Sequence, residues 1–219
     1  MTDQLILKFP SKKIYLKEDF YVSPSNIKAY DFINSWPKWI KRIVNIFGPP
    51  GSGKTHIASI LKSKTSVLEI DSGTLDDKVF FKFKTKEVLI IKNLNENISE
   101  NLLYSLWNTA LQDNKYFLIT SNKPINSYKF KLKDLISRIN SCPCIGIELP
   151  SDDLISVILA KNLSDKQIKV EKSHIDYIVK RIDRSYEKIA QFILTLDKYS
   201  LKKGSPFSLK LIKEVLKMI

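Results

Sequence analysis

Five short apolar runs dominate the first 150 residues of the chain. They are rich in β-branched and aromatic residues: RIVNIF (42–47), SVLEI (66–70), EVLII (87–91), YFLIT (116–120) and CIGIEL (144–149). Runs of this length without polar alternation are typical of strands buried on both faces of a sheet. Segments with helical spacing follow the first run (GKTHIASILKSK) and the third (SENLLYSLWNTALQDN). The alternation predicts an α/β fold with a parallel, three-layer sheet.

The pattern changes near Pro150. Beyond it, four segments have helical spacing, start near Ser or Asp, and show no strand between them. We therefore predict three parts: a polar tether over residues 1–19, an α/β core over 20–150, and a small all-α domain over 151–219.

Two further segments are open to interpretation. The amphipathic SNIKAYDFINSW pattern predicts a helix capped by Ser25 or Asn26. The aromatic-rich VFFKFKTK stretch (79–86) is interpreted either as a base-stacking surface or as a sheet edge or loop packed on the core. We favour the packing interpretation.

The net charge of +13 does not by itself indicate a nucleic-acid-binding protein. Lysine supplies nearly all of the positive charge, and the lysines are scattered rather than gathered in one stripe. We expect DNA binding to be indirect or weak, through sequence-independent phosphate contacts. The four arginines are more informative, because lysine cannot replace a forked guanidinium at a bidentate phosphate contact.

The remaining composition argues for a cytoplasmic protein. The two cysteines, Cys142 and Cys144, are interpreted as buried strand thiols, since a metal site needs about four ligands and the only histidines are His56 and His174. No stretch reaches the roughly 18 apolar residues that cross a membrane, and the N-terminus lacks a signal-peptide pattern. We expect a reducing compartment and no membrane partner.

The sequence GPPGSGKT, which ends at Thr55, is a phosphate-binding loop placed between a predicted strand and a predicted helix. Gly51 and Gly53 allow backbone N–H groups to converge on phosphate oxygens at the positive end of the helix. Lys54 is expected to reach the outer phosphates and the Thr55 hydroxyl to ligate Mg²⁺. The core is therefore predicted to bind a nucleotide.

The acids that usually follow a later strand of such proteins are missing. Lys92 and Asn93 stand where one carboxylate holds the metal and a second positions water. Asp71 and Glu96 are the nearest acids, but neither falls at the required point. We predict that the chain binds nucleotide and hydrolyses it poorly or not at all. One hypothesis is that Lys92 replaces part of the metal charge beside the phosphates.

Motifs in this order resemble the DnaA/Hda-type AAA+ family over nearly the whole chain. FLITSN (117–122) resembles the sensor-1 strand, LKDLISRI (132–139) the arginine-finger segment, IDRSYEKIAQFILTLD (182–197) the sensor-2 helix, and DFYVSPSNIKAYDFI (19–33), here called the approach segment, the part that packs near adenine. The resemblance implies sensor 1 at Asn122, a finger at Arg138 and sensor 2 at Arg184. Local pairing is the alternative for each: Arg138 with Asp134, Arg184 with Asp183 or Glu187, and Asn122 with nearby backbone.

The resemblance is closest to the Hda branch of the family for two reasons. The chain is expected to end with the helical domain, without the DNA-binding helix-turn-helix domain of DnaA. The N-terminal QLILKF also resembles a clamp-binding peptide, through Gln4, Leu5, Leu7 and Phe9. A chance apolar N-terminus is the alternative for that short match.

The family resemblance implies a regulator of replication initiation. Such a protein binds ADP, or ATP, docks on the DNA polymerase sliding clamp, and uses Arg138 in trans to promote hydrolysis of DnaA-bound ATP. Its partners are then the clamp and DnaA; self-association and Mg²⁺ dependence are left open. The implied nucleotide contacts are Val22, Asn26, Pro50, Gly51, Ser52, Gly53, Lys54, Thr55, His56, Asn122 and Arg184. The rival interpretation is an autonomous AAA+ ATPase of helicase-loader or transposition-helper type that acts on DNA.

Overall fold

A computed structural model describes residues 19–166, 168, 170–203 and 208–219. The predicted clamp-binding residues Gln4, Leu5, Leu7 and Phe9 lie outside this part of the chain.

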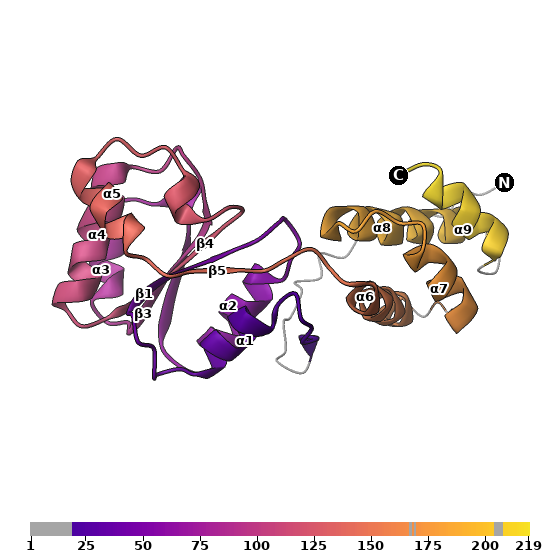
Figure 1. Cartoon of the computed structure of the whole chain (residues 1–219), viewed down its shortest axis with the longest axis horizontal. Helices are drawn as coiled ribbons and strands as arrows, with labels where there is room; N and C mark the ends of the chain where they lie inside the picture. Colours follow the sequence, from indigo (N-terminus) through magenta and orange to yellow (C-terminus); the bar gives the residue numbers. More distant parts are fainter. Residues whose placement is uncertain (1–18, 167, 169, 204–207) are drawn as a thin grey trace.

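The described chain contains a parallel five-stranded sheet (Figure 1). Its strands are β1 (Ile43–Phe47), β2 (Val67–Asp71), β3 (Val88–Leu94), β4 (Tyr116–Ser121) and β5 (Cys144–Gly146). Their order is β2-β3-β4-β1-β5, and every pairing is parallel. The predicted α/β class with a parallel sheet is confirmed.

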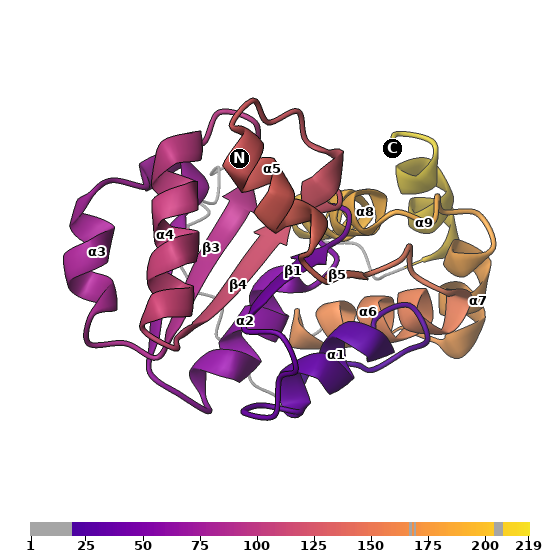
Figure 2. The same cartoon turned by 60° about the vertical axis from the view of Figure 1, so that its left-hand side comes forward.

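Helices cover both faces of the sheet, as the unbroken apolar strands require. One face carries α1 (Ile27–Asn34) and α2 (Lys54–Lys62), and the other carries α3 (Lys78–Phe83), α4 (Glu100–Gln112) and α5 (Lys133–Asn140). Figure 2 shows α3, α4 and α5 together on their face. Side chains of β3 alternate between the two cores, with Ile90 facing α2 and Ile91 facing α4.

The structure corrects the expectation of an edge strand or loop at residues 79–86, where it has the short helix α3. Val79 and Phe83, four residues apart, share one face and are fully buried. Phe81 points the other way and is 79% exposed. The adjacent aromatic residues Phe80 and Phe81 obscured this helical spacing.

Four helices follow the sheet: α6 (Asp152–Asp165), α7 (Lys172–Val179), α8 (Tyr186–Lys203) and α9 (Leu209–Leu216). They enclose a hydrophobic core of their own, which includes Leu159, Phe192 and Ile212. Ser151 and Ser208 cap α6 and α9 by accepting hydrogen bonds from backbone N–H groups in the first turn. We call this helical unit the lid; Figure 1 shows it beside the sheet.

Strand β5 is shorter than the apolar pattern suggests, and the residues after it join the lid to the core. Ile147 still donates its N–H to Phe47 O at 2.7 Å, but Glu148 donates to Ser25 O at 2.9 Å. The chain thus leaves the sheet by pairing with the approach segment before α6 begins.

No helix among the described residues is both long enough and apolar enough to span a bilayer.

Candidate nucleotide-binding site

The phosphate loop joins β1 to the N-terminus of α2 at the carboxyl edge of the sheet. Gly51 and Gly53 have φ of +78° and +91°, the left-handed region that a glycine enters without a Cβ clash. Gly48 donates its N–H to Ser121 O at 3.2 Å, and a Cβ on Gly48 would stand 2.7 Å from Ile147 O. The neighbouring strands therefore fix the start of the loop.

Lys54 is folded onto the carbonyls of its own loop. Its Nζ lies 2.6 Å from Gly48 O and 2.9 Å from Pro49 O, and the residue is 8% exposed. Burial lowers the pKa of the Lys54 amine to about 8. Ser52 is also buried, whereas Pro50 and Thr55 are exposed. The loop thus offers a cation and helix N–H groups at one point, a combination suited to phosphate.

The approach segment lies against the end of the loop. The Phe20 ring stacks on Tyr30 with centroids 5.5 Å apart and meets the His56 ring edge-on at 5.1 Å. A Cβ on Gly53 would stand 3.2 Å from the Phe20 ring. The structure therefore brings the segment and the predicted contact His56 together.

Asn26 fixes the shape of this segment rather than capping α1. It occupies the N-cap position without a side-chain cap bond. Its Oδ1 instead accepts from Ser23 N at 2.9 Å, and its Nδ2 donates to Tyr21 O at 3.0 Å. Asn26 is 4% exposed, and Val22 lies half-buried within the bend that it closes. The hydrogen bonds of Asn26 therefore fix the bend of the approach segment, which lies beside the phosphate loop.

The lid meets the loop through Tyr186, the first residue of α8. A Cβ on Gly51 would stand 3.0 Å from the Tyr186 Cβ, and the Tyr186 hydroxyl donates to Glu148 O at 3.3 Å. Burial raises the pKa of this phenol, and a hydrogen bond with Ser25 acts in the opposite direction. One tyrosine thus touches the loop, the strand exit and the approach segment.

Arg184 stands two residues before Tyr186, in the lid segment that adjoins the loop. Its Nη2 lies 3.0 Å from Asp152 Oδ2, and the Arg184 side chain is 65% exposed. The partner is thus the first residue of α6, not Asp183 or Glu187. Because this surface pair is weakly held, it leaves Arg184 available to a phosphate.

A buried polar residue that the sequence reasoning missed supports the other side of the loop. Asn45, fully buried in β1, donates to Ile119 O at 3.1 Å and to Ser121 Oγ at 2.9 Å, and accepts from Ile125 N at 2.9 Å. These bonds hold the end of β4, so that Asn122 follows it as an exposed residue next to the loop. A single Asn within the β-branched IVNIF strand was the available signal.

Lys92 and Asn93, which replace the missing acids, contact carboxylates of the neighbouring strand β2. Lys92 Nζ lies 2.8 Å from Glu69 Oε1, and Lys62 of α2 pairs with the other oxygen of Glu69. Asn93 has φ of +55° at a break in the β3–β4 register, and its Nδ2 donates to Asp71 Oδ2 at 2.6 Å. The Lys92 amine is therefore held by a carboxylate on β2.

A divalent cation does not fit the described residues well. Thr55 is present, but Asp71 also accepts from Gly73 N at 3.0 Å, and Glu96 pairs with Lys123 at 3.1 Å. Within the described ranges, no three His, Cys, Asp or Glu side chains gather as a metal site. Burial raises the pKa of the Cys142 thiol to about 12, which agrees with an inert buried cysteine. The expectation of two buried strand thiols holds only in part, because Cys142 precedes β5 and Cys144, in β5, is half-buried.

Arg138 is exposed in the last turn of α5. Leu135 and Ile139 anchor that helix on the sheet face opposite α2, and Ser141 closes it by donating from its hydroxyl to Arg138 O at 2.8 Å. Among the described residues, Arg138 forms no ion pair with Asp134. The guanidinium is thus presented outward from a fixed helix end.

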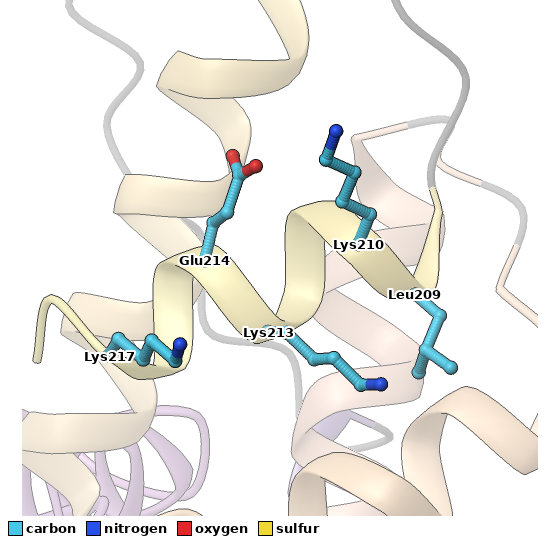
Figure 3. Close-up of a pocket in the computed structure, with 5 residues that line it drawn as sticks. All are labelled: Leu209, Lys210, Lys213, Glu214 and Lys217. Atoms are coloured by element: carbon cyan, nitrogen blue, oxygen red, sulfur yellow. The ribbon is translucent and has the colours of Figure 1, made fainter.

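A surface depression of about 370 Å³ lies on α9, away from these residues (Figure 3). Leu209, Lys210, Lys213, Glu214 and Lys217 line it. The lining side chains come from α9 and from Lys217 at its C-cap, and most are flexible lysines, which is typical of a solvated helix face. We assign it no role in the nucleotide site.

Comparison with known proteins finds sequence relatives among replication initiators. The chain is 25% identical to the chromosomal replication initiator protein DnaA of Borrelia hermsii over 198 residues, an alignment that covers 78% of this chain and 41% of that protein. It is 24% identical to DnaA of Nitrosomonas eutropha, with 78% and 42% covered. The chain therefore spans less than half the length of these relatives. No protein-family profile matches it.

Solved structures show the same fold. Domain III of Thermotoga maritima DnaA superposes with a TM-score of 0.77 at 21% identity, covering 95% of this chain and 98% of that one. The Thermotoga maritima RuvB Holliday junction branch migration motor superposes with a TM-score of 0.66 at 17% identity, covering 89% and 68%. The chain has the α/β fold of P-loop AAA+ proteins, and in sequence it is similar to the DnaA replication initiators.

Proposed function

We propose that this chain is an Hda-like regulator of replication initiation, which holds an adenine nucleotide and promotes hydrolysis of ATP bound to DnaA. The observation that carries the proposal is an intact phosphate loop beside a strand end that bears Lys92 and Asn93 in place of acids. A loop of this kind retains its nucleotide, while the missing carboxylates leave hydrolysis to another protein.

The nucleotide of the chain is ADP or ATP and has a structural role. Solved structures of DnaA carry the ATP analogue AMPPCP, which supports an adenine nucleotide here. The loop contacts both the approach segment, through Gly53 and Phe20, and the lid, through Gly51 and Tyr186. A nucleotide held there lies where core and lid meet, so its binding stabilises one arrangement of the two.

Arg138 acts on the partner. Its helix, α5, packs on the sheet face opposite α2, the helix that follows the phosphate loop. The Arg138 side chain is exposed and forms no ion pair with Asp134. An arginine presented to the γ-phosphate of a neighbouring molecule contributes about 10³–10⁵ in rate in other nucleotide hydrolases. DnaA-bound ATP is the proposed target.

The sliding clamp is the proposed docking partner, through Gln4, Leu5, Leu7 and Phe9 in the N-terminal tether. A peptide with spaced apolar anchors on a leash is suited to a preformed groove. The described chain begins at Asp19, and the next residue, Phe20, lies against Gly53 of the phosphate loop, so the tether joins the core beside that loop.

An autonomous ATPase acting on DNA is the second candidate, and the fold shared with the RuvB motor favours it. The absence of carboxylates at positions 92 and 93 argues against it. Purified protein that turns over ATP at about one per second, within the usual enzyme range, would establish this alternative.

The test of the main proposal is a reconstituted reaction. DnaA loaded with ATP is mixed with clamp on DNA and with wild-type protein, a Gln4→Ala/Leu5→Ala/Phe9→Ala variant, or Arg138→Ala. We expect the triple variant to lose clamp binding, and Arg138→Ala to bind the clamp but lose stimulation. Arg181→Ala is the matched control, because Arg181 is exposed and stacks on Tyr177 within the lid. Full stimulation by Arg138→Ala would refute the finger assignment.

A further inference from the structure

We infer that the nucleotide site of this chain works without a divalent cation, so that ADP binds equally well with and without Mg²⁺. The inference rests on the proposed nucleotide binding and concerns what the site requires. It is based on the contacts that hold Lys92 and Asn93 at the end of β3, and not only on the absence of acids from the sequence there.

The first step concerns Lys92. A metal-binding carboxylate at this position would direct negative charge toward the phosphates. The structure has an ammonium there, 29% exposed, and Glu69, 13% exposed, holds it at 2.8 Å. Its positive charge opposes a cation at the strand end, and its engagement with Glu69 keeps it in place.

The second step concerns Glu69, the carboxylate that lies nearest to Lys92 on the sheet. It is shared between Lys92 and Lys62, one lysine on each oxygen. Burial and the neighbouring Lys92 charge lower the pKa of the Lys62 amine, which shows that two cations crowd one acid. Glu69 therefore carries no spare charge with which to bind a third cation.

The third step concerns Asn93. Its φ of +55° places it in the left-handed region, where Asn is tolerated better than most residues, and the strand register shifts at this point. Its amide bonds Asp71, which also caps the turn after β2 by accepting from Gly73 N. The second acid position thus belongs to a β-bulge that ties two strand ends together.

The Thr55 hydroxyl is exposed and is the ligand that the loop itself offers to Mg²⁺, and within the described ranges no three His, Cys, Asp or Glu side chains gather to complete a site. Magnesium demands near-octahedral oxygen coordination and is usually bound through one or two carboxylates in addition to phosphate. The helix N-terminus and the Lys54 ammonium supply the positive charge that a diphosphate requires. Binding then needs no metal.

The test measures the dissociation constant of ADP by calorimetry, with MgCl₂ and with EDTA. For wild-type protein we expect the two constants to agree within about twofold. A weakening of about tenfold or more in EDTA would overturn the inference and leave nucleotide binding intact. No ADP binding in either condition would overturn the proposed nucleotide site as well, so the two failures are distinguishable.

Two variants test the cause. Lys92→Asp combined with Glu69→Gln restores a carboxylate at the strand end and removes the acid that holds Lys92, and we expect Mg²⁺ to tighten ADP binding by about tenfold. Lys92→Asn with Glu69→Gln removes the same ion pair and adds no acid, so it should stay indifferent to Mg²⁺. Circular dichroism and thermal melting establish that both fold. Mg²⁺ dependence in the Asn variant, or its absence in a folded Asp variant, would refute the assignment to Lys92.

Discussion

Tyr186 of the lid lies directly over Gly51 of the phosphate loop, where a Cβ on the glycine would stand 3.0 Å from the Tyr186 Cβ. Gly51 also has φ of +78°, so both its backbone and its surroundings exclude a side chain. The contact joins two parts of the chain more than 130 residues apart and puts the lid within reach of whatever the loop binds.

Gly51→Ala should therefore lower the free energy of unfolding by about 1–2 kcal/mol and weaken ADP binding, because alanine is strained at this φ and pushes on Tyr186. Urea denaturation and ADP titration measure the two effects. Gly73→Ala is the matched control: its Cβ would meet only Asp71 Oδ1, at 3.4 Å. It should change stability by less than about 0.5 kcal/mol. Equal effects of the two changes would contradict the prediction.

Asn45→Leu should destabilise the core by roughly 2–5 kcal/mol, because it strands the Ile125 N–H and the Ile119 carbonyl inside the sheet. Chemical denaturation monitored by tryptophan fluorescence measures this loss. Asn101→Leu, on the exposed face of α4, makes the same chemical change at the surface and should stay within about 0.5 kcal/mol of wild type. A loss of less than about 1 kcal/mol for Asn45→Leu would show that the hydrogen bonds of Asn45 are not needed to hold the end of β4.

Nucleotide binding should take up a proton at alkaline pH. The Lys54 amine has a pKa of about 8 in the folded protein against an ordinary 10.5, so above 8 it is neutral in the free chain. A phosphate favours the charged form, and ADP affinity should fall by up to about tenfold per pH unit above that value. Calorimetry of ADP binding in two buffers of different ionisation enthalpy reports the proton uptake. Lys54→Arg, which stays charged, should abolish the proton uptake. If wild-type protein takes up no proton on binding ADP even above pH 8, the assignment to Lys54 is wrong.

The lowered pKa of Lys54 should also make the free energy of unfolding depend on pH. Between about 8 and 10.5 the unfolded chain keeps a proton on Lys54 that the folded chain has released, so stability should rise with pH across this window. Below about 8 both states are charged and the burial cost of Lys54 is fully present. Above 9.0 the Cys142 thiol, with a pKa raised to about 12, acts in the opposite direction. Urea denaturation at a series of pH values should show the rise, and Lys54→Met should reduce it, leaving the contribution of Lys62, whose pKa is also lowered by burial.

Glu100→Ala should loosen the helix that carries Arg138. The Glu100 carboxylate accepts hydrogen bonds from Lys131 N at 2.8 Å and Leu132 N at 2.7 Å, just before α5 begins. Loss of these charge-assisted bonds should cost roughly 1–3 kcal/mol of stability and reduce stimulation of the partner. Glu96→Ala, which breaks only a surface pair with Lys123, should cost less than about 1 kcal/mol. Identical stability of the two variants would refute this role of Glu100.

The strands and the phosphate loop were predictable because each has a local signal. Buried parallel strands appear as apolar runs, and GPPGSGKT lies between one of them and a helix. Helix α3 was not predictable, because it is stabilised by Val79 and Phe83 packing against a core that strands distant in sequence form. The end of β3 was misjudged for a related reason: the bulge at Asn93 is fixed by Asp71 on another strand.

Site residues were predictable as types but not as partners. The positions of Lys54 and Thr55 follow from the motif, whereas the pairing of Arg184 with Asp152 joins residues 32 apart in the chain. Sequence proximity suggested Asp183 and Glu187 for that role, and it gave no sign that Glu69 holds Lys92. Asn45 could have been suspected as the one polar residue of its strand, but its three bonds depend on β4 and the turn after it.

The ion pair between Asp19 and Lys161 ties the N-terminal end of the described chain to the lid. Asp19 Oδ1 lies 2.5 Å from Lys161 Nζ on α6, and the next residue, Phe20, rests against Gly53 and His56. Asp19 and Phe20 therefore attach the start of the described chain to a lid helix and to the phosphate loop at once. A protein bound to the preceding residues, as proposed for the clamp, would be connected to both parts through these two neighbouring residues.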